Sequence, residues 1–237
     1  MDQQTEKNLL DLVKRNYEEI AADFDITRKS CFWPELAKIA DSVKNGDRVL
    51  DAGCGNGRLL EMLSGKKIEY LGIDSSQELV KIAQVRFPDK IFLLGDILEL
   101  DRAPEKGFDY VFCIAVLHHL PGESLRVAAL RQMKNKLQPA SAGSARGGGK
   151  IIITVWNLWQ AKFRRLIFKF AILKIFGKSK MDFGDILFSW KNKKGEEASR
   201  RYYHAFIKSE LKKIASQAGL KINELYKDKF NYYLILE

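Results

Sequence analysis

The sequence predicts an α/β protein with a Rossmann-like, doubly wound sheet that is mostly parallel and has helices on both faces. Short apolar runs alternate with helical segments, as expected when parallel strands are joined by crossover helices. A glycine-rich turn, Gly53-Cys54-Gly55-Asn56-Gly57, follows the first of these runs. The last two β-type runs are joined by a turn too short for a crossover helix, so we expect them to pair antiparallel.

Periodicity gives the elements in order. Apolar side chains at helical spacing predict a helix over residues 5–23, and a second helix should begin near Pro34 and end before Asn45-Gly46. The expected parallel strands are 48–51, 68–74, 91–95, 108–114 and 150–156. The expected helices between them are 57–64, 75–86 and 123–137. A helix over 208–218 then precedes the terminal runs, 220–226 and 230–236.

The length of 237 residues suits one large α/β domain over 1–237. Within it we expect N-terminal helices over the cofactor site (1–44) and a basic substrate-binding insertion (157–205). The low-complexity segment 140–149 is expected to be a loop. Scattered cysteines without C-x-x-C spacing suggest neither disulfides nor a zinc site, and they favour a reducing, cytoplasmic location.

The N-terminus is polar and acidic, unlike a signal peptide. The apolar stretch 163–176 is interrupted by four cationic side chains, so no membrane span is expected. The net charge is +10, and residues 161–201 hold 12 basic against 4 acidic side chains. Interleaved aromatic residues make this segment suitable for an RNA backbone. Alternatively, it forms an amphipathic helix packed on the domain or lying on a membrane surface.

The glycine turn favours S-adenosylmethionine (SAM) over a dinucleotide. Its third glycine follows the second by two residues, which does not match the fingerprint of a pyrophosphate-binding turn. Asp51 precedes the turn, and its carboxylate would repel a pyrophosphate but attract the ammonium and sulfonium of SAM. We expect Asp74 to accept from the ribose hydroxyls and Asp96 from the adenine amino group, with Ile97 packed on the ring. Each acid could instead cap a following helix.

Over residues 45–156 the chain resembles class I SAM-dependent methyltransferases, a likeness that implies a seven-stranded sheet ending in an antiparallel hairpin. Further stretches resemble the family that methylates the carboxymethyl group on the wobble uridine (U34) of tRNA. They are Tyr17-Glu18-Glu19-Ile20-Ala21, Thr27-Arg28, Trp33-Pro34, Ile114-Ala115-Val116-Leu117-His118-His119, Val155-Trp156, Asp185-Ile186-Leu187-Phe188-Ser189-Trp190-Lys191, Arg201-Tyr202-Tyr203-His204 and Asn231-Tyr232-Tyr233. The family usually has proline at the position of Ser189, and a compact Pro-Gly-Gly turn in place of segment 140–149.

This resemblance implies esterification of carboxymethyluridine in tRNA, with no DNA and no metal at the site, and some family members work with a small zinc-binding activator subunit. A carboxylate is already ionised at neutral pH, so no general base is needed, and we expect Arg28, His118 and Arg201 to position it. The expected cofactor residues are Tyr17, Asp51, Gly53, Gly55, Asn56, Gly57, Asp74, Ser75, Asp96, Ile97 and Ala115. The expected substrate residues are Arg28, Trp33, His118, His119, Trp156, Trp190, Arg201, Tyr202, His204, Asn231 and Tyr232.

Several of these residues could instead have structural roles. The histidines could serve packing or loop hydrogen bonds, and the tryptophans could belong to the core. Two other functions are also compatible with the sequence: a methyltransferase for a quinone or lipid precursor, with helix 163–176 as a hydrophobic lid, and a SAM- or RNA-binding adaptor without turnover.

Overall fold

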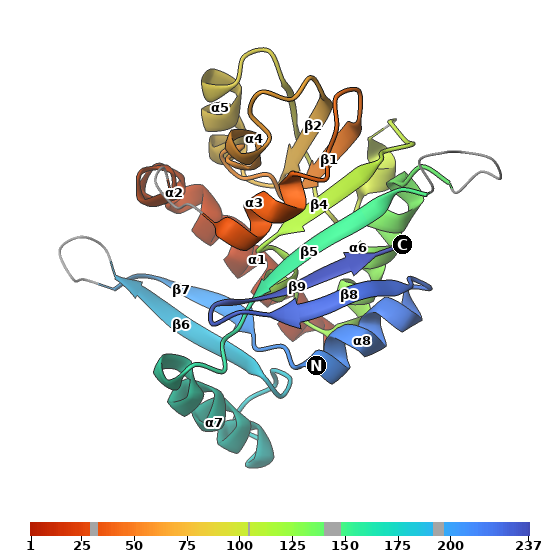
Figure 1. The fold of residues 1–237 in the computed structure, drawn as a ribbon. Helices are drawn as coiled ribbons and strands as arrows, with labels where there is room; N and C mark the ends of the chain where they lie inside the picture. Colours follow the sequence, from red (N-terminus) through yellow and green to blue (C-terminus); the bar gives the residue numbers. More distant parts are fainter. Residues whose placement is uncertain (29–32, 104, 140–147, 192–196) are drawn as a thin grey trace.

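The structure is a computed structural model that describes residues 1–28, 33–103, 105–139, 148–191 and 197–237, with side chains for all of these except residues 28, 190, 191 and 197–199. Its centre is a seven-stranded sheet in the order β3-β2-β1-β4-β5-β9-β8 (Figure 1). The strands are β1 (Arg48–Ala52), β2 (Glu69–Asp74), β3 (Ile91–Leu94), β4 (Tyr110–Ile114), β5 (Lys150–Trp156), β8 (Ile222–Lys227) and β9 (Asn231–Leu236).

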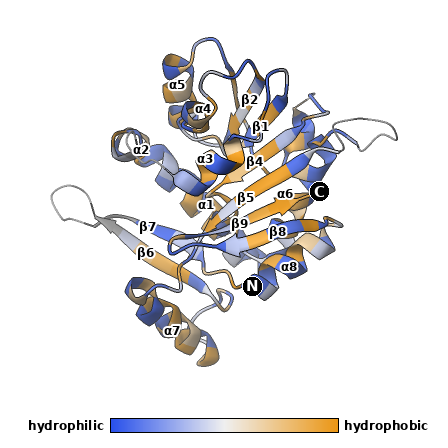
Figure 2. Cartoon of the chain, in the orientation of Figure 1, coloured by the Kyte–Doolittle hydropathy of each residue, from blue (hydrophilic) through white to orange (hydrophobic). Residues whose placement is uncertain are grey.

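The first five strands are parallel, and β9 is antiparallel to both β5 and β8. The predicted fold class and the terminal antiparallel pair are therefore confirmed. All five predicted parallel strands are present within two residues of their expected bounds. The central strands carry continuous apolar runs because both faces of the sheet are covered (Figure 2).

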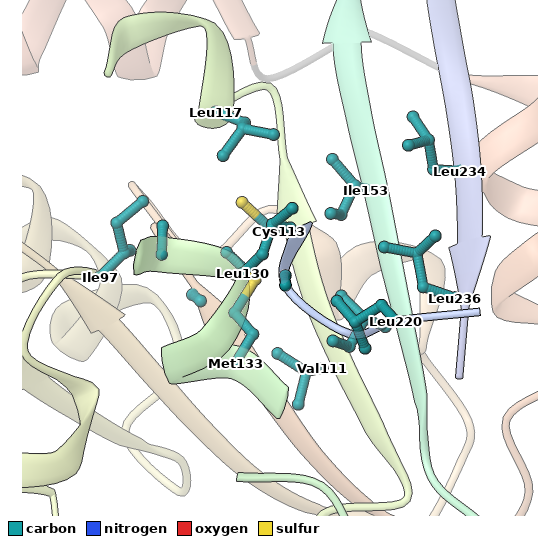
Figure 3. Close-up of a cluster of buried hydrophobic side chains, with 14 of the residues drawn as sticks. Ile97, Val111, Cys113, Leu117, Leu130, Met133, Ile153, Leu220, Leu234 and Leu236 are labelled. Atoms are coloured by element: carbon teal, nitrogen blue, oxygen red, sulfur yellow. The ribbon is translucent and has the colours of Figure 1, made fainter. Parts of the chain in front are cut away.

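The helices cover the sheet on both sides. They are α1 (Gln3–Glu19), α2 (Ala21–Arg28), α3 (Pro34–Ala40), α4 (Leu59–Met62), α5 (Gln77–Arg86), α6 (Glu123–Lys136), α7 (Ala161–Ile175) and α8 (Lys208–Gln217). One core cluster joins Val111 in the sheet to Leu130 in α6 (Figure 3). The same cluster includes Leu50 in β1 and Ile214 in α8. The other joins neighbouring strand residues to α3, α4 and α5. Adjacent residues of one strand thus point to opposite faces of the sheet and pack in different clusters, which fixes the strand register.

The prediction of one helix over residues 5–23 is wrong in its extent. Asp2 caps α1 by accepting from the Thr5 amide at 2.7 Å, so the helix begins earlier than expected. It ends at Glu19 because Ile20 takes φ −102° and ψ 4°, after which α2 begins. Neither glycine nor proline marks this break, and Ile20 and Ala21 are both buried, so the apolar pattern continues across it.

A second, two-stranded sheet lies beside the large one. Strands β6 (Asp185–Lys191) and β7 (Glu197–His204) pair antiparallel, and α7 packs against them (Figure 1). In the described part of the chain, none of the helices is long and apolar enough to cross a membrane.

A buried polar network fastens this hairpin to the core. Asp185 accepts hydrogen bonds from the Tyr202 hydroxyl and from His204 Nδ1, both at 2.7 Å. The guanidinium of Arg126 in α6 lies 3.5 Å from the same carboxylate and donates to the Tyr202 hydroxyl at 3.1 Å. Because a buried charge is costly without partners, this network joins β6, β7 and α6 tightly.

Candidate active site

A cavity of about 1010 Å³ opens at the carboxyl ends of the parallel strands. The turns after β1, β2 and β4 and the segment after β3 form one wall, and α1 lies across them. Open α/β sheets bind ligands at this edge. The expected site residues that line the cavity are Tyr17, Trp33, Gly53, Gly55, Asn56, Asp74, Ser75, Asp96, Ile97, Ala115, His119, Trp156, Arg201 and Asn231.

The glycine turn brings main chain, rather than side chains, to the cavity wall. Gly53 has φ +84°, and a Cβ there would lie 2.4 Å from Cγ2 of Val116. Ala115, next to that valine, also has a positive φ of 58°, which is strained for a residue with a side chain. The turn after β1 and the turn after β4 thus approach one another too closely for any side chain at position 53.

The carboxylate of Asp74 holds this turn in place. Its Oδ2 accepts from the Gly55 amide at 2.8 Å, and its Oδ1 accepts from the Ser76 amide at 2.9 Å. Burial raises the pKa of Asp74, and these hydrogen bonds oppose that rise. Further along the wall, Asp96 Oδ1 accepts from the Leu98 amide at 2.9 Å. Both acids have a fixed orientation at the cavity wall.

Asp51 lies behind the wall rather than on it. It is only 2% exposed and accepts from the Tyr70 hydroxyl at 2.8 Å. Burial raises the pKa of Asp51 to about 7, with the carboxylate of Asp74 contributing to the rise. A cation that entered the neighbouring cavity would therefore favour the ionised form of this carboxyl group.

One face of α1 forms the roof of the cavity. Leu10, Val13, Lys14 and Tyr17 recur at helical spacing and all line it. Of these, only Tyr17 was expected from the sequence. The spacing that identified the helix also contained the signal for the other three, because residues three, four and seven apart lie on one helix face.

His119 holds the Tyr17 hydroxyl in one orientation. Burial lowers the pKa of His119 to about 4, so the ring is neutral at physiological pH. Its Nδ1 lies 3.2 Å from the Tyr202 carbonyl oxygen, an acceptor, and so must carry the proton. Its Nε2 then accepts from the Tyr17 hydroxyl at 2.7 Å. Arg201, on the cavity wall, places its guanidinium 5.9 Å from the centre of the same tyrosine ring.

Stacked rings support the far end of the cavity. The rings of Trp156 and Tyr203 are 5.2 Å apart and inclined by 17°, and His118 stacks on Tyr203 at 5.5 Å. His118 Nδ1 accepts from the Trp156 amide at 3.3 Å, and burial lowers its pKa well below the ordinary value. Trp156 reaches the cavity, whereas His118 is buried outside its lining.

Other expected residues lie elsewhere. Tyr202 and His204 belong to the buried network around Asp185, and Tyr232 is buried in the core of the large sheet. Gly57 has φ +76° and packs against Phe87 and Phe92 behind the turn. The side chains of Arg28 and Trp190 are outside the described residues.

The same end of the cavity, beside Trp156, contains further lining residues that the sequence analysis missed. Trp33 donates from Nε1 to the Tyr233 hydroxyl at 2.6 Å, and the guanidinium of Arg58 lies 5.7 Å from the tryptophan ring centre. Beyond Arg58, Glu35 and Leu158, the missed lining residues at this end include Gln160, Lys162, Phe163, Asp228, Lys229 and Phe230. The last six come from two connecting segments far apart in sequence, and no local pattern indicated that these segments meet.

The residues that line this cavity fit SAM. The acids are fixed at the ends of neighbouring strands, the glycine turn leaves room that a Cβ would fill, and the cavity is large enough for a cofactor and an acceptor together. Across the residues that the structure describes, no cluster of three or more histidine, cysteine or acidic side chains is arranged to hold a metal.

Comparison with known proteins agrees with this site. Residues 49–140 match the family model described as "Methyltransferase domain". The structure resembles a SAM-dependent methyltransferase from Methanosarcina mazei with a TM-score of 0.66, 17% identity and coverage of 86% of this chain and 97% of the other. That likeness concerns the fold.

Two relatives are informative. A Schizosaccharomyces pombe protein named tRNA (carboxymethyluridine(34)-5-O)-methyltransferase is 30% identical, with 95% of each chain covered. A Xenopus tropicalis relative that carries the same enzyme name is 27% identical over 95% of this chain but only 40% of its own length. The chain is a SAM-dependent methyltransferase and belongs to the family of the tRNA (carboxymethyluridine(34)-5-O)-methyltransferases.

Proposed function

We propose that this protein transfers the methyl group of SAM to the carboxymethyl group of the wobble uridine in tRNA, forming a methyl ester. One observation carries the proposal: a single cavity joins the acids and glycine turn at the strand ends to a second region with Trp156 and Arg201. The names of relatives such as the S. pombe enzyme support this acceptor.

In this proposal, the cofactor occupies the end of the cavity next to the glycine turn. Asp74 and Asp96 accept from the ribose and the adenine, and Asp51 attracts the ammonium group from behind the wall. Tyr17, with its hydroxyl proton committed to His119, turns oxygen lone pairs toward the cavity. Asn56 and Ser75 lie beside this end, and Ile97 and Ala115 complete its wall.

The chemistry needs alignment rather than proton transfer. When bound, SAM supplies a methyl group on a positively charged sulfur. Arg201 is proposed to hold the acceptor carboxylate in line with that group, while Trp156 supports the uracil. Arg28 and His118 are proposed to assist, His118 through its contacts with Trp156 and Tyr203. Because a carboxylate is ionised at neutral pH, the described site works without a general base.

The alternative of a hydrophobic lid over a small apolar acceptor is less consistent with the structure. Among the described residues of α7, only Lys162 and Phe163, near its N-terminus, line the cavity. The large exposed apolar side chains Phe168, Ile172 and Ile175 are outside that lining. The helix therefore presents a cation and an aromatic ring to the acceptor region.

We also propose a small zinc-binding activator subunit and a cytoplasmic location. Strand β3 supports a partner, since it is the outermost strand of the large sheet among the described residues, and Ile91 and Leu94 on it are each 59% exposed. Replacing both residues with lysine should abolish activation by such a subunit and leave the unactivated rate in place. The control carries lysine in place of Ile172 and Ile175, two exposed residues of α7. Equal activation of all three proteins would refute docking at β3.

Incubation with labelled SAM and total tRNA tests the reaction. The label should appear in one nucleoside after digestion and be lost under mild base, as a methyl ester would be. Arg201→Ala should abolish labelling, whereas replacement of its exposed neighbour, Arg200→Ala, should not. Label that resists base, or that appears only with lipid extracts, would refute this acceptor.

Asp74→Ala tests the cofactor end separately. Loss of the carboxylate leaves the Gly55 and Ser76 amides without their acceptor, so SAM affinity should fall at least about tenfold. The Asp74→Asn variant retains one acceptor oxygen at this position and should bind SAM more tightly than the Asp74→Ala variant. Unchanged binding by calorimetry in both variants would mean that Asp74 does not meet the cofactor.

A further inference from the structure

Two short segments form opposite lips at the acceptor end of the cavity. The first lip, residues 160–163, is the start of α7, and the second, residues 228–231, is the turn between β8 and β9 (Figure 1). Trp156 at the end of β5 pairs with Asn231 at the start of β9. The first lip follows β5 and the second leads into β9, so both lie at the same end of these two paired strands.

Hydrogen bonds fix the distance between the lips. The Asn157 amide donates to the Phe230 carbonyl oxygen at 2.7 Å, and Asn157 Nδ2 donates to the Lys229 carbonyl oxygen at 3.4 Å. Gln160 of the first lip donates from Nε2 to the Asn157 carbonyl oxygen at 2.8 Å. The two lips therefore behave as one preformed opening.

The lips carry the same pair of side chains. The Lys162 ammonium lies 5.3 Å from the centre of the Phe163 ring, and the Lys229 ammonium lies 5.4 Å from that of Phe230. Both lysines are exposed, and Phe230 is 58% exposed although it lines the cavity. Phe163 is half-buried and packs edge-to-face on Phe188, with the ring centres 5.5 Å apart. An exposed phenyl ring on a turn adds little to folding, so its position beside the opening calls for another explanation.

We propose that these lips bind the nucleotides on either side of the methylated uridine, with the Phe230 ring stacking on one flanking base and each lysine pairing with a flanking phosphate. This inference rests on the proposed tRNA acceptor. A base that enters an enzyme cavity leaves its neighbours without a stacking partner. Aromatic rings replace such stacking in single-stranded RNA, and adjacent cations neutralise the backbone.

Asp228 is the acidic residue on the second lip, and its hydrogen bonds are directed into the protein. Its Oδ1 accepts from the amides of Phe230 and Asn231 at 2.7 and 2.6 Å, and its Oδ2 accepts from the Tyr233 hydroxyl at 2.7 Å. The carboxylate thus shapes the turn that presents Phe230.

Binding of a fluorescent anticodon stem-loop RNA that carries carboxymethyluridine at the wobble position tests the lips without requiring turnover. Phe230→Ala should weaken binding by about 5- to 150-fold, and Phe230→Trp should retain it. Phe183→Ala is the matched control: that ring is 55% exposed beneath Lys174 at 5.6 Å but lies outside the cavity lining. Equal affinities of the Phe230→Ala variant, the control and the wild type would overturn the proposal.

A modified RNA identifies the contact. Removing the base on one side of the uridine should weaken wild-type binding and abolish the difference between wild type and Phe230→Ala. Lys229→Ala should lower the slope of log affinity against log salt by about 0.7, with Lys212→Ala on α8 as the control. Phe230→Ala and removal of a flanking base could instead weaken binding independently, so that their losses in binding free energy add. Such additivity for the bases on both sides of the uridine would overturn the assignment of the stacking partner.

These outcomes separate the lips from the reaction. If the stem-loop binds through the lips but gains no methyl ester, the proposed reaction fails while the lip assignment stands. If the ester forms at equal rates in wild type and Phe230→Ala, and their affinities are also equal, the reaction stands and the lip assignment fails.

Discussion

At the residue scale, Asp51 combines a folding cost with a proposed binding role. The pKa of Asp51 is about 7 in the folded protein against 3.8 for an ordinary aspartate, because the carboxyl group is buried. Between these values the unfolded chain binds fewer protons than the folded one, so this group lowers the free energy of unfolding as pH rises toward 7. Above about pH 7 the cost is complete, at most about 4 kcal/mol.

Asp51→Asn should therefore stabilise the protein without cofactor. We expect a higher Tm than wild type at pH 8.5 and a smaller difference at pH 5, because the asparagine never needs to ionise. The amide oxygen can still accept from the Tyr70 hydroxyl. Thermal denaturation of both proteins across this pH range measures the effect, and a gain independent of pH would contradict it.

The same variant should bind SAM more weakly, since it lacks the charge that attracts the ammonium. For wild type, affinity should fall as pH drops below about 7 and the carboxyl group becomes protonated. Calorimetry at several pH values checks this. A parallel pH dependence in the Asn variant would assign the titration to another group.

At the element scale, the glycine turn is constrained by what it approaches. Gly53→Ala would add a Cβ 2.4 Å from Val116 and force φ +84° on a residue with a side chain. We expect loss of SAM binding and a stability cost above that of Gly46→Ala. Gly46 has a nearly equal φ of +85° with no atom within 4 Å of the added carbon, so it isolates the backbone strain.

The difference in Tm between these two alanine variants measures the clash alone. Strain at a positive φ should cost about 1 kcal/mol in each protein, and the clash should add about 1–3 kcal/mol at position 53. Equal Tm values would show that Val116 moves aside freely.

The β6–β7 hairpin depends on Asp185. Asp185→Ala would leave the Arg126 guanidinium buried without this carboxylate, which costs about 3–5 kcal/mol for a broken buried pair. We expect the hairpin to open before the large sheet unfolds, with proteolysis first within residues 178–204. Asp182→Ala, which removes a more exposed acid of the same segment, serves as the control. Equal protease resistance of both variants would contradict a local role for Asp185.

The sequence predicted the large sheet well because each buried strand carries its own apolar run. The terminal pair β8–β9 was predicted from two β-type runs joined by a short turn, whereas strands β6 and β7 were not predicted. Much of that hairpin's burial comes from α7 and α1, so its pattern depends on tertiary contacts rather than on alternation. The break at Ile20 has no glycine or proline signal, and the buried Ile20 and Ala21 continue the apolar pattern across it.

The site divides in the same way. The glycine turn, Asp74 and Asp96 could be predicted because each follows a strand directly. Tyr202, His204 and Tyr232 were placed in the site by motif order, but the structure puts their side chains in buried packing. The lips at 160–163 and 228–231 come from separate parts of the chain, and only the pairing of β5 with β9 brings them together.

At the scale of the whole molecule, charge is distributed unevenly around the cavity. The chain carries a net charge of +10, and residues 161–201 hold 12 basic against 4 acidic side chains. Arg164, Arg165 and Lys169 are exposed on α7, close in sequence to the first lip. In the proposed complex, an RNA whose uridine enters the cavity would pass beside this face, which attracts phosphates from a distance of about one Debye length.

A triple variant with glutamate at positions 164, 165 and 169 should therefore bind tRNA more weakly than wild type and bind SAM with unchanged affinity. If each contacts one phosphate, the slope of log affinity against log salt should fall by about 2–3. The control replaces Lys208, Lys212 and Lys221, which are exposed near α8, and changes the net charge equally. A slope that falls equally in both proteins would mean that net charge, rather than the α7 face, attracts the RNA. If the α7 variant instead retains tRNA binding and loses binding to vesicles of anionic lipid, the basic face serves a membrane surface.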